Sequence, residues 1–117
     1  NEISEMDFLQ SVKNKVETGG IRHSDFLNKK VKKVAVLGGS GSFAIAAAKA
    51  QNADVLVTSD LKYHDFYQAE NSILLADVGH FESERYVKNY IFDYLSKKIR
   101  TFAIILSSIK TNPVNYL

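Results

Sequence analysis

Apolar residues in this chain form short continuous runs that are separated by polar or glycine-containing stretches. Three such runs lie at Val34–Leu37, Val55–Val57 and Ile73–Leu75, and a fourth lies at Thr101–Leu106. Continuous apolar runs of this length are typical of strands that are buried on both faces of a sheet. The pattern therefore predicts four main strands.

Between these runs, apolar residues recur at helical spacing. A first helix is predicted to begin after Ser4, which is followed by Asp7 in the manner of a capping box, and to end before Gly19-Gly20. Further helices are predicted over residues 43–50, 62–70 and 81–100. Strands that alternate with helices over short connections indicate an α/β fold with a mainly parallel sheet and helices on both faces.

The length of 117 residues suits one domain with a single core. We divide it into a helical lead-in over residues 1–30 and a core over residues 31–117. The chain begins with Asn1 rather than Met. We therefore expect it to be a piece of a longer protein.

Composition excludes several classes of site. The chain has no cysteine, which rules out disulfides and thiolate metal sites and fits a cytoplasmic protein. No apolar stretch approaches the roughly 18 to 20 residues of a membrane span. The formal charge is only +2, so a nucleic-acid partner is not indicated. The basic run at residues 29–33 is best interpreted as a solvated loop, with a phosphate-contacting patch as the alternative.

The first predicted strand ends in a glycine-rich turn. Gly39, Ser40 and Gly41 would let a ligand approach the backbone closely, and the helix that follows offers free N–H groups to an anion. With Ala44 and a later Asp60, the turn also satisfies a dinucleotide-binding fingerprint. Such short glycine motifs are common, and a tight turn without a ligand explains this one equally well.

The second predicted strand is followed by Asp60, Lys62 and His64. Asp60 stands where a helix N-cap is needed, and that structural role alone would explain it. His64 lies about one helical turn further on, where a histidine is more often structural than functional. Lys62 would bind an anionic substrate or remain solvated.

The third predicted strand leads into Asp77, His80 and Glu84. At about 100° per residue, His80 and Glu84 differ by only ~40° around a helix and share a face. An imidazole nitrogen and a carboxylate oxygen in this arrangement can bind the same divalent ion. The same spacing also suits a surface ion pair. Two ligands are too few for a tight site, so the others would come from elsewhere.

The segments 34–42, 53–65 and 77–80, with Ser83-Glu84-Arg85, resemble the carboxyl-terminal part of the NGG-one-interacting-factor-three-like proteins. These proteins are also called GTP cyclohydrolase I type 2 homologues. The resemblance runs from about residue 31 to residue 98, with a weaker echo at Thr111-Asn112-Pro113. It departs from the family pattern at Ser59, where glycine is usual.

The resemblance implies a site for two divalent metal ions, which could be Zn, Fe, Mn or Mg. His80 and Glu84 match the family's carboxyl-terminal ligands, whereas its amino-terminal ligands have no counterpart here, since residues 1–30 contain only His23. Asp77 would accept from an imidazole N–H. The residues that would lie near the metal or face the substrate are Gly39, Ser40, Gly41, Asp60, Lys62 and His64.

The resemblance also implies that this chain is the carboxyl-terminal half of a two-part metal-binding protein that forms ring-like homo-oligomers such as hexamers. The complete protein would be a metal-dependent hydrolase of a small nucleotide-like substrate, and this chain alone would be inactive. One alternative is a non-enzymatic metal-binding regulatory or scaffold module. A second alternative is a dinucleotide-binding enzyme domain. No catalytic residue is assigned.

Overall fold

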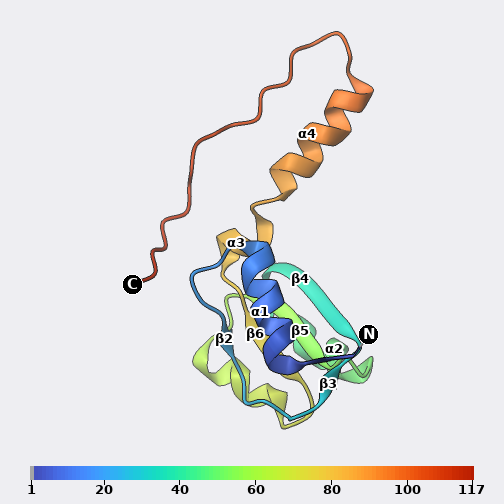
Figure 1. Ribbon diagram of the computed structural model, residues 1–117, viewed down its shortest axis with the longest axis vertical. Helices are drawn as coiled ribbons and strands as arrows, with labels where there is room; N and C mark the ends of the chain where they lie inside the picture. Colours follow the sequence, from blue (N-terminus) through green and yellow to red (C-terminus); the bar gives the residue numbers. More distant parts are fainter. Residues whose placement is uncertain (1) are drawn as a thin grey trace.

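A four-stranded sheet forms the centre of the computed structural model, which describes residues 2–117 (Figure 1). The strands are β2 (Arg22–His23), β4 (Val34–Ser40), β5 (Val55–Ser59) and β6 (Leu74–Asp77), in the spatial order β2-β6-β5-β4. The last three are parallel, and β2 pairs antiparallel with β6. The predicted α/β fold with a mainly parallel sheet is confirmed. The interpretation of Asn1 falls outside the described residues.

Alternate residues of β5 and β6 enter two separate apolar clusters, because successive side chains of a strand point to opposite faces. Val55, Val57, Leu74 and Ala76 pack with Leu9 of the first helix. Leu56 and Leu75 pack instead with Ile45 and Leu61. Each fully buried side chain of this size contributes about 1.5–3 kcal/mol. The two central strands are therefore the most firmly held part of the fold.

The first helix, α1 (Glu5–Val16), begins where the sequence predicts it. The Ser4 hydroxyl oxygen accepts a hydrogen bond from the Asp7 backbone N–H at 3.1 Å. Before and after this helix, two short strands, β1 (Ile3–Ser4) and β3 (Lys30–Val31), pair antiparallel with each other.

The connections between the parallel strands are shorter than predicted. A 3-10 turn, η1 (Ser42–Ala44), leads into α2 (Ile45–Ala50) between β4 and β5. Between β5 and β6 lies η2 (Tyr63–Ala69), which is a 3-10 helix rather than the predicted α-helix. At the start of η1 no side chain caps the first turn, whereas at the start of η2 the Asp65 carboxylate accepts from the Lys62 backbone N–H at 2.8 Å.

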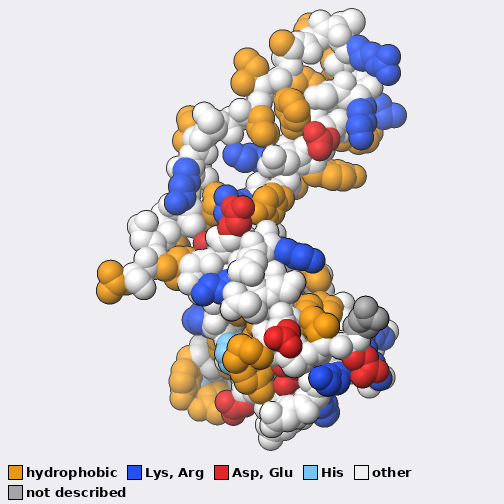
Figure 2. All heavy atoms as spheres, in the orientation of Figure 1, with side chains coloured by type: hydrophobic (Ala, Val, Ile, Leu, Met, Phe, Trp, Pro, Cys, Tyr) orange, Lys and Arg blue, Asp and Glu red, His pale blue; other side chains and the backbone are white. Residues whose placement is uncertain are grey.

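The prediction of one continuous helix over residues 81–100 is wrong, because the helix is interrupted. It is divided into α3 (His80–Glu84), which lies against the sheet, and α4 (Val87–Lys98), which leaves the body of the molecule (Figure 1). No residue of α4 is buried, and hydrophobic side chains lie exposed on the surface of this part of the molecule (Figure 2). The apolar stripe on this helix has no surface to pack on within residues 2–117, and periodicity cannot reveal such a break.

The strand predicted over residues 101–106 is also wrong. Residues 99–117 have no regular secondary structure and run back from the end of α4 toward the body (Figure 1). Phe102 and Ile105 are 76% and 88% exposed. A strand needs a neighbouring strand to satisfy its N–H and C=O groups, and this segment has none in the described chain. The fourth strand is β2 instead. Within residues 2–117, no helix is long and apolar enough to cross a membrane.

Candidate functional site

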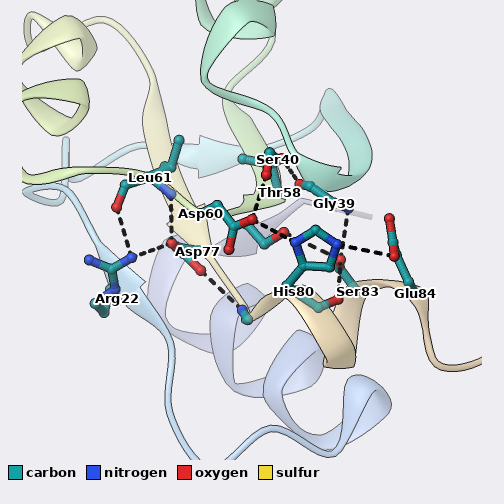
Figure 3. A network of polar contacts seen from close by, with 12 residues as sticks. Arg22, Gly39, Ser40, Thr58, Asp60, Leu61, Asp77, His80, Ser83 and Glu84 are labelled. Carbon is teal, nitrogen blue, oxygen red and sulfur yellow. Dashed lines mark hydrogen bonds and ion pairs between the residues drawn. The ribbon is translucent and has the colours of Figure 1, made fainter. Parts of the chain in front are cut away.

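The carboxyl ends of β4, β5 and β6 bring together most of the polar residues that the sequence singles out (Figure 3). Asp60 follows β5 directly with a left-handed backbone (φ 56°). His80 is the first residue of α3, and Gly79 before it has φ 93°, which suits a residue without Cβ. These two sharp turns direct both side chains to the same edge of the sheet.

Asp60 and His80 form the centre of the site. His80 Nδ1 lies 2.5 Å from Asp60 Oδ2, and the Ser40 hydroxyl donates to the same carboxylate oxygen. The hydrogen bond to Asp60 raises the pKa of His80 above its ordinary value. In turn, the bonds from Ser40 and then His80 hold the pKa of Asp60 below its ordinary value. The carboxylate therefore fixes the orientation of the imidazole ring.

Glu84 lies on the other side of the imidazole. Its Oε2 atom is 3.2 Å from His80 Nε2, as the predicted spacing of one helical turn requires. The side chains of Asp60, His80 and Glu84 are each about half exposed. The three residues thus form a row in which each ring nitrogen of His80 faces a carboxylate.

The predicted close approach at Gly39 is real, but it is made by the protein itself. Gly39 has φ +73°, and a Cβ at this position would lie 2.5 Å from Glu84 Oε1. The Gly39 N–H donates to Ser83 Oγ at 2.9 Å, and that hydroxyl donates to the His80 carbonyl at 2.8 Å. Ser83 thereby ties the glycine turn to the helix that carries His80 and Glu84.

Gly41 has a different role. A Cβ at Gly41 would lie 1.9 Å from Thr58 Oγ1, and the Gly41 N–H donates to the Ser59 carbonyl at 3.3 Å. This residue is therefore explained by the tight packing of the turn on β5.

Asp77 does not contact the imidazole, although the sequence predicts that it accepts from an imidazole N–H. It is 5% exposed, and its Oδ2 atom accepts from the Leu61 N–H at 2.9 Å and from Arg22 Nη2 at 2.5 Å. Its Oδ1 atom accepts from the Gly79 N–H at 3.0 Å. These bonds join the turns after β5 and β6 to strand β2 (Figure 3). The partner of the imidazole is Asp60, which therefore is not the predicted helix N-cap; Lys62 stands at the N-cap of η2.

Lys62 and His64 lie apart from this row. His64 is exposed on η2, where its ring centroid is 5.0 Å from that of Tyr63 and 6.4 Å from that of Tyr67. The Lys62 backbone N–H donates to Asp65 at the start of η2. Neither residue lines the cavity beside His80. The structure therefore does not bring them together with the other candidates.

A cavity of about 1090 Å³ opens beside the row. Asp60, His80 and Glu84 line it together with Arg22 and Arg85, and residues 107–116 of the tail form another wall. Sequence reasoning missed Arg22, because a two-residue strand gives no periodic signal. It also missed the tail as a wall, although Thr111-Asn112-Pro113 belongs to it.

The described residues contain no group of three or more His, Cys, Asp or Glu side chains that is arranged to hold a metal ion. Two features nevertheless fit partial ligation. Ligands bound to one ion at about 2.0–2.2 Å lie about 3.0–3.4 Å apart, and His80 Nε2 and Glu84 Oε2 are separated by 3.2 Å. Metal-binding histidines also donate their other N–H to an oriented acceptor, and Asp60 stands there.

Several proteins of known sequence resemble this chain over its whole length. The GTP cyclohydrolase 1 type 2 homolog of Bacillus subtilis (strain 168) is 35% identical over 122 residues, covering 100% of this chain and 32% of the relative. The homolog of Staphylococcus aureus (strain MSSA476) is 33% identical, covering 100% of this chain and 33% of the relative. This chain therefore spans about a third of the length of these relatives.

Solved structures agree with the sequence relatives. Staphylococcus aureus protein SA1388 superposes with a TM-score of 0.85 at 29% identity, covering 100% of this chain and 39% of that chain. A Bacillus cereus protein related to NIF3 superposes with a TM-score of 0.84 at 31% identity, covering 100% and 34%. The model of one family, Duf34/NIF3 (NGG1p interacting factor 3), matches residues 1–113. The chain belongs to the Duf34/NIF3 family.

Proposed function

We propose that this chain supplies His80 and Glu84 to a divalent metal site whose remaining ligands come from residues outside the chain. The observation that carries the proposal is the row Asp60–His80–Glu84. One ring nitrogen of His80 is held by Asp60 at 2.5 Å, while the other lies 3.2 Å from the Glu84 carboxylate. A metal-binding imidazole needs such an oriented N–H and such a neighbouring ligand.

The reaction that this site best supports is hydrolysis of a small nucleotide-like substrate in the cytoplasm by the complete protein, with two metal ions at the site. Bound metal ions lower the pKa of a coordinated water and polarise a substrate oxygen. The residues of this chain would orient the ligands through Asp60 and Ser40 and would bound the cavity. The relatives' name, GTP cyclohydrolase 1 type 2 homolog, supports a nucleotide-like substrate.

A second candidate is a non-enzymatic metal-binding scaffold that assembles into ring-like homo-oligomers. The exposed apolar side chains of α4, among them Tyr90 at 72% and Ile91 at 49% exposure, support an assembled state. A dinucleotide-binding role has less support, because Asp60, which would hold the ribose, is already bonded to Ser40 and His80. A screen of nucleotides on the metal-loaded protein separates hydrolase from scaffold, since only a hydrolase turns one of them over.

The ligand assignment is tested by metal titration of the complete protein that carries this chain. His80→Ala and Glu84→Ala are expected to lower metal content, and Asp60→Asn is expected to weaken metal affinity about 10- to 100-fold. His64→Ala is the matched control, because this exposed histidine lies outside the cavity, and it should leave affinity unchanged. Full metal content in both His80→Ala and Glu84→Ala would show that the assignment is wrong.

A further inference from the structure

Arg22 holds a fixed position on the wall of the cavity beside His80. Its Nη2 atom donates to the buried Asp77 carboxylate at 2.5 Å and to the Leu61 carbonyl at 2.8 Å. Its guanidinium carbon lies 5.5 Å from the centre of the Phe66 ring. These three contacts hold the guanidinium end of the Arg22 side chain in place. Because the side chain is already ordered, a ligand that binds it loses less free energy to restricting its rotamers.

The same guanidinium still has donors to offer. Arginine carries five N–H groups, and within residues 2–117 both of the Arg22 hydrogen bonds use Nη2. This leaves the N–H groups of Nε and Nη1 for a ligand. The Arg22 side chain is 62% exposed, whereas that of Asp77 is only 5% exposed. The charge of Arg22 is thus anchored from the protein side and open toward the cavity.

The other cations of the cavity wall are directed elsewhere. Arg85 pairs with Glu17 at 3.1 Å and lies over the rings of Phe81 and Tyr86. Lys88 donates from Nζ to the Ser107 carbonyl at 2.9 Å. Arg22 is therefore the cation on this wall that is best placed to receive a ligand from the cavity.

We propose that Arg22 binds an oxyanion, a phosphate or carboxylate group, of the molecule that enters the cavity beside His80. This inference rests on the proposed function, since it names the chemical class of ligand for the same site. The carboxylates of Asp60 and Glu84 also line the cavity and would repel an anion. Divalent ions held by His80 and Glu84 would offset that repulsion, and Arg22 would then bind the oxyanion from the same cavity wall.

Inorganic phosphate and acetate are the two probes, and they are titrated separately by calorimetry into the metal-loaded complete protein. A hydrogen bond to a charged group contributes about 1.5–3 kcal/mol, so Arg22→Gln is expected to weaken binding of the preferred probe about 10- to 100-fold. Lys88→Gln, which removes a cation from the same wall, is the matched control and should change affinity less than about twofold. Tighter binding of phosphate identifies a phosphate ligand, and tighter binding of acetate identifies a carboxylate.

A second readout needs no substitution. In the wild-type protein, the side-chain ¹⁵Nε resonance of Arg22 should shift as the probe saturates the site. The inference is overturned if neither probe binds, if Arg22→Gln binds both as the wild type does, or if the Arg22 resonance does not move at saturation. Metal titration of Arg22→Gln separates the two proposals. Normal metal content with phosphate and acetate binding independent of Arg22 refutes this inference alone, whereas metal binding that survives His80→Ala and Glu84→Ala refutes the proposed site.

Discussion

Replacing Asp77 with alanine removes one buried carboxylate that three donors share. The carboxylate accepts from the Leu61 N–H, the Gly79 N–H and Arg22 Nη2. Leu61 is 2% exposed, so its N–H group cannot reach water when the acceptor is lost. Asp77→Ala should therefore destabilise the fold, although Asp77 does not contact the imidazole.

The size of the effect follows from the three bonds. The bond to the buried Leu61 N–H is the largest, at about 1.5–3 kcal/mol, because the acceptor is charged and the abandoned donor stays desolvated. The Gly79 N–H is only partly buried and adds about 0.5–1.5 kcal/mol. The ion pair adds at most about 1 kcal/mol, because the Arg22 side chain is 62% exposed. The sum is about 2–5.5 kcal/mol, and Asp77→Asn should lose about half, since its amide oxygen still accepts.

The free energy of unfolding is measured by urea titration followed by circular dichroism. Asp93→Ala is the control, because this aspartate is exposed on α4, and it should change stability by less than about 0.5 kcal/mol. An Asp77→Ala protein that loses under about 1 kcal/mol would refute the argument that buried hydrogen bonds to Asp77 hold the turns after β5 and β6 in place.

Two further predictions concern the glycine turn and the start of β5. Gly39→Ala should lower the unfolding free energy by about 1–2 kcal/mol because Gly39 has a positive φ. It should also weaken metal affinity, because the new Cβ would displace the Glu84 carboxylate. Gly38→Ala is the control in both assays, since a Cβ there meets only ordinary van der Waals contacts. Asp54 accepts from the backbone N–H groups of the two residues between β3 and β4, chiefly the second, and these bonds lower its pKa. The stabilisation of the fold by the Asp54 carboxylate is therefore full above the unfolded pKa of about 3.9 and is lost as pH falls through the lower folded pKa. The difference in unfolding free energy between wild type and Asp54→Asn should shrink below about pH 4. An equal difference at pH 3 and pH 7 would contradict this.

The parallel strands could be predicted from the sequence because their burial is local information. Every residue of β5 and β6 is buried, and both strands begin with three apolar residues, so their runs are visible in the sequence. The run at Val34–Leu37 also predicted a strand, but not its burial, because β4 lies at the edge of the sheet and Val34 and Val36 are exposed. Strand β2 could not be predicted. It has two exposed residues, and it exists because its partner β6 offers a free edge.

The candidate site was predictable in place but not in detail. The carboxyl ends of parallel strands meet at one edge, so Asp60, His80 and Glu84 could be expected near one another. Which of Asp60 and Asp77 faces the imidazole depends on backbone angles. Asp60 has φ 56° and thereby turns its carboxylate toward His80, while Asp77 is still in strand β6 and directs its carboxylate toward Leu61 and Arg22. Spacing along the sequence contains neither angle.

The two errors in the second half of the chain have a common physical origin. The spacing of apolar residues predicts which side chains are to be buried. It does not say whether the surface that buries them belongs to residues 2–117 or to another part of the protein. In α4 and residues 99–117 the apolar side chains are largely exposed, so the pattern describes burial that residues 2–117 do not provide. Isolated helices of about 12 residues are marginal in water. We therefore expect α4 to show low hydrogen-exchange protection in the isolated chain and higher protection in the complete protein; equal protection in both would contradict this explanation.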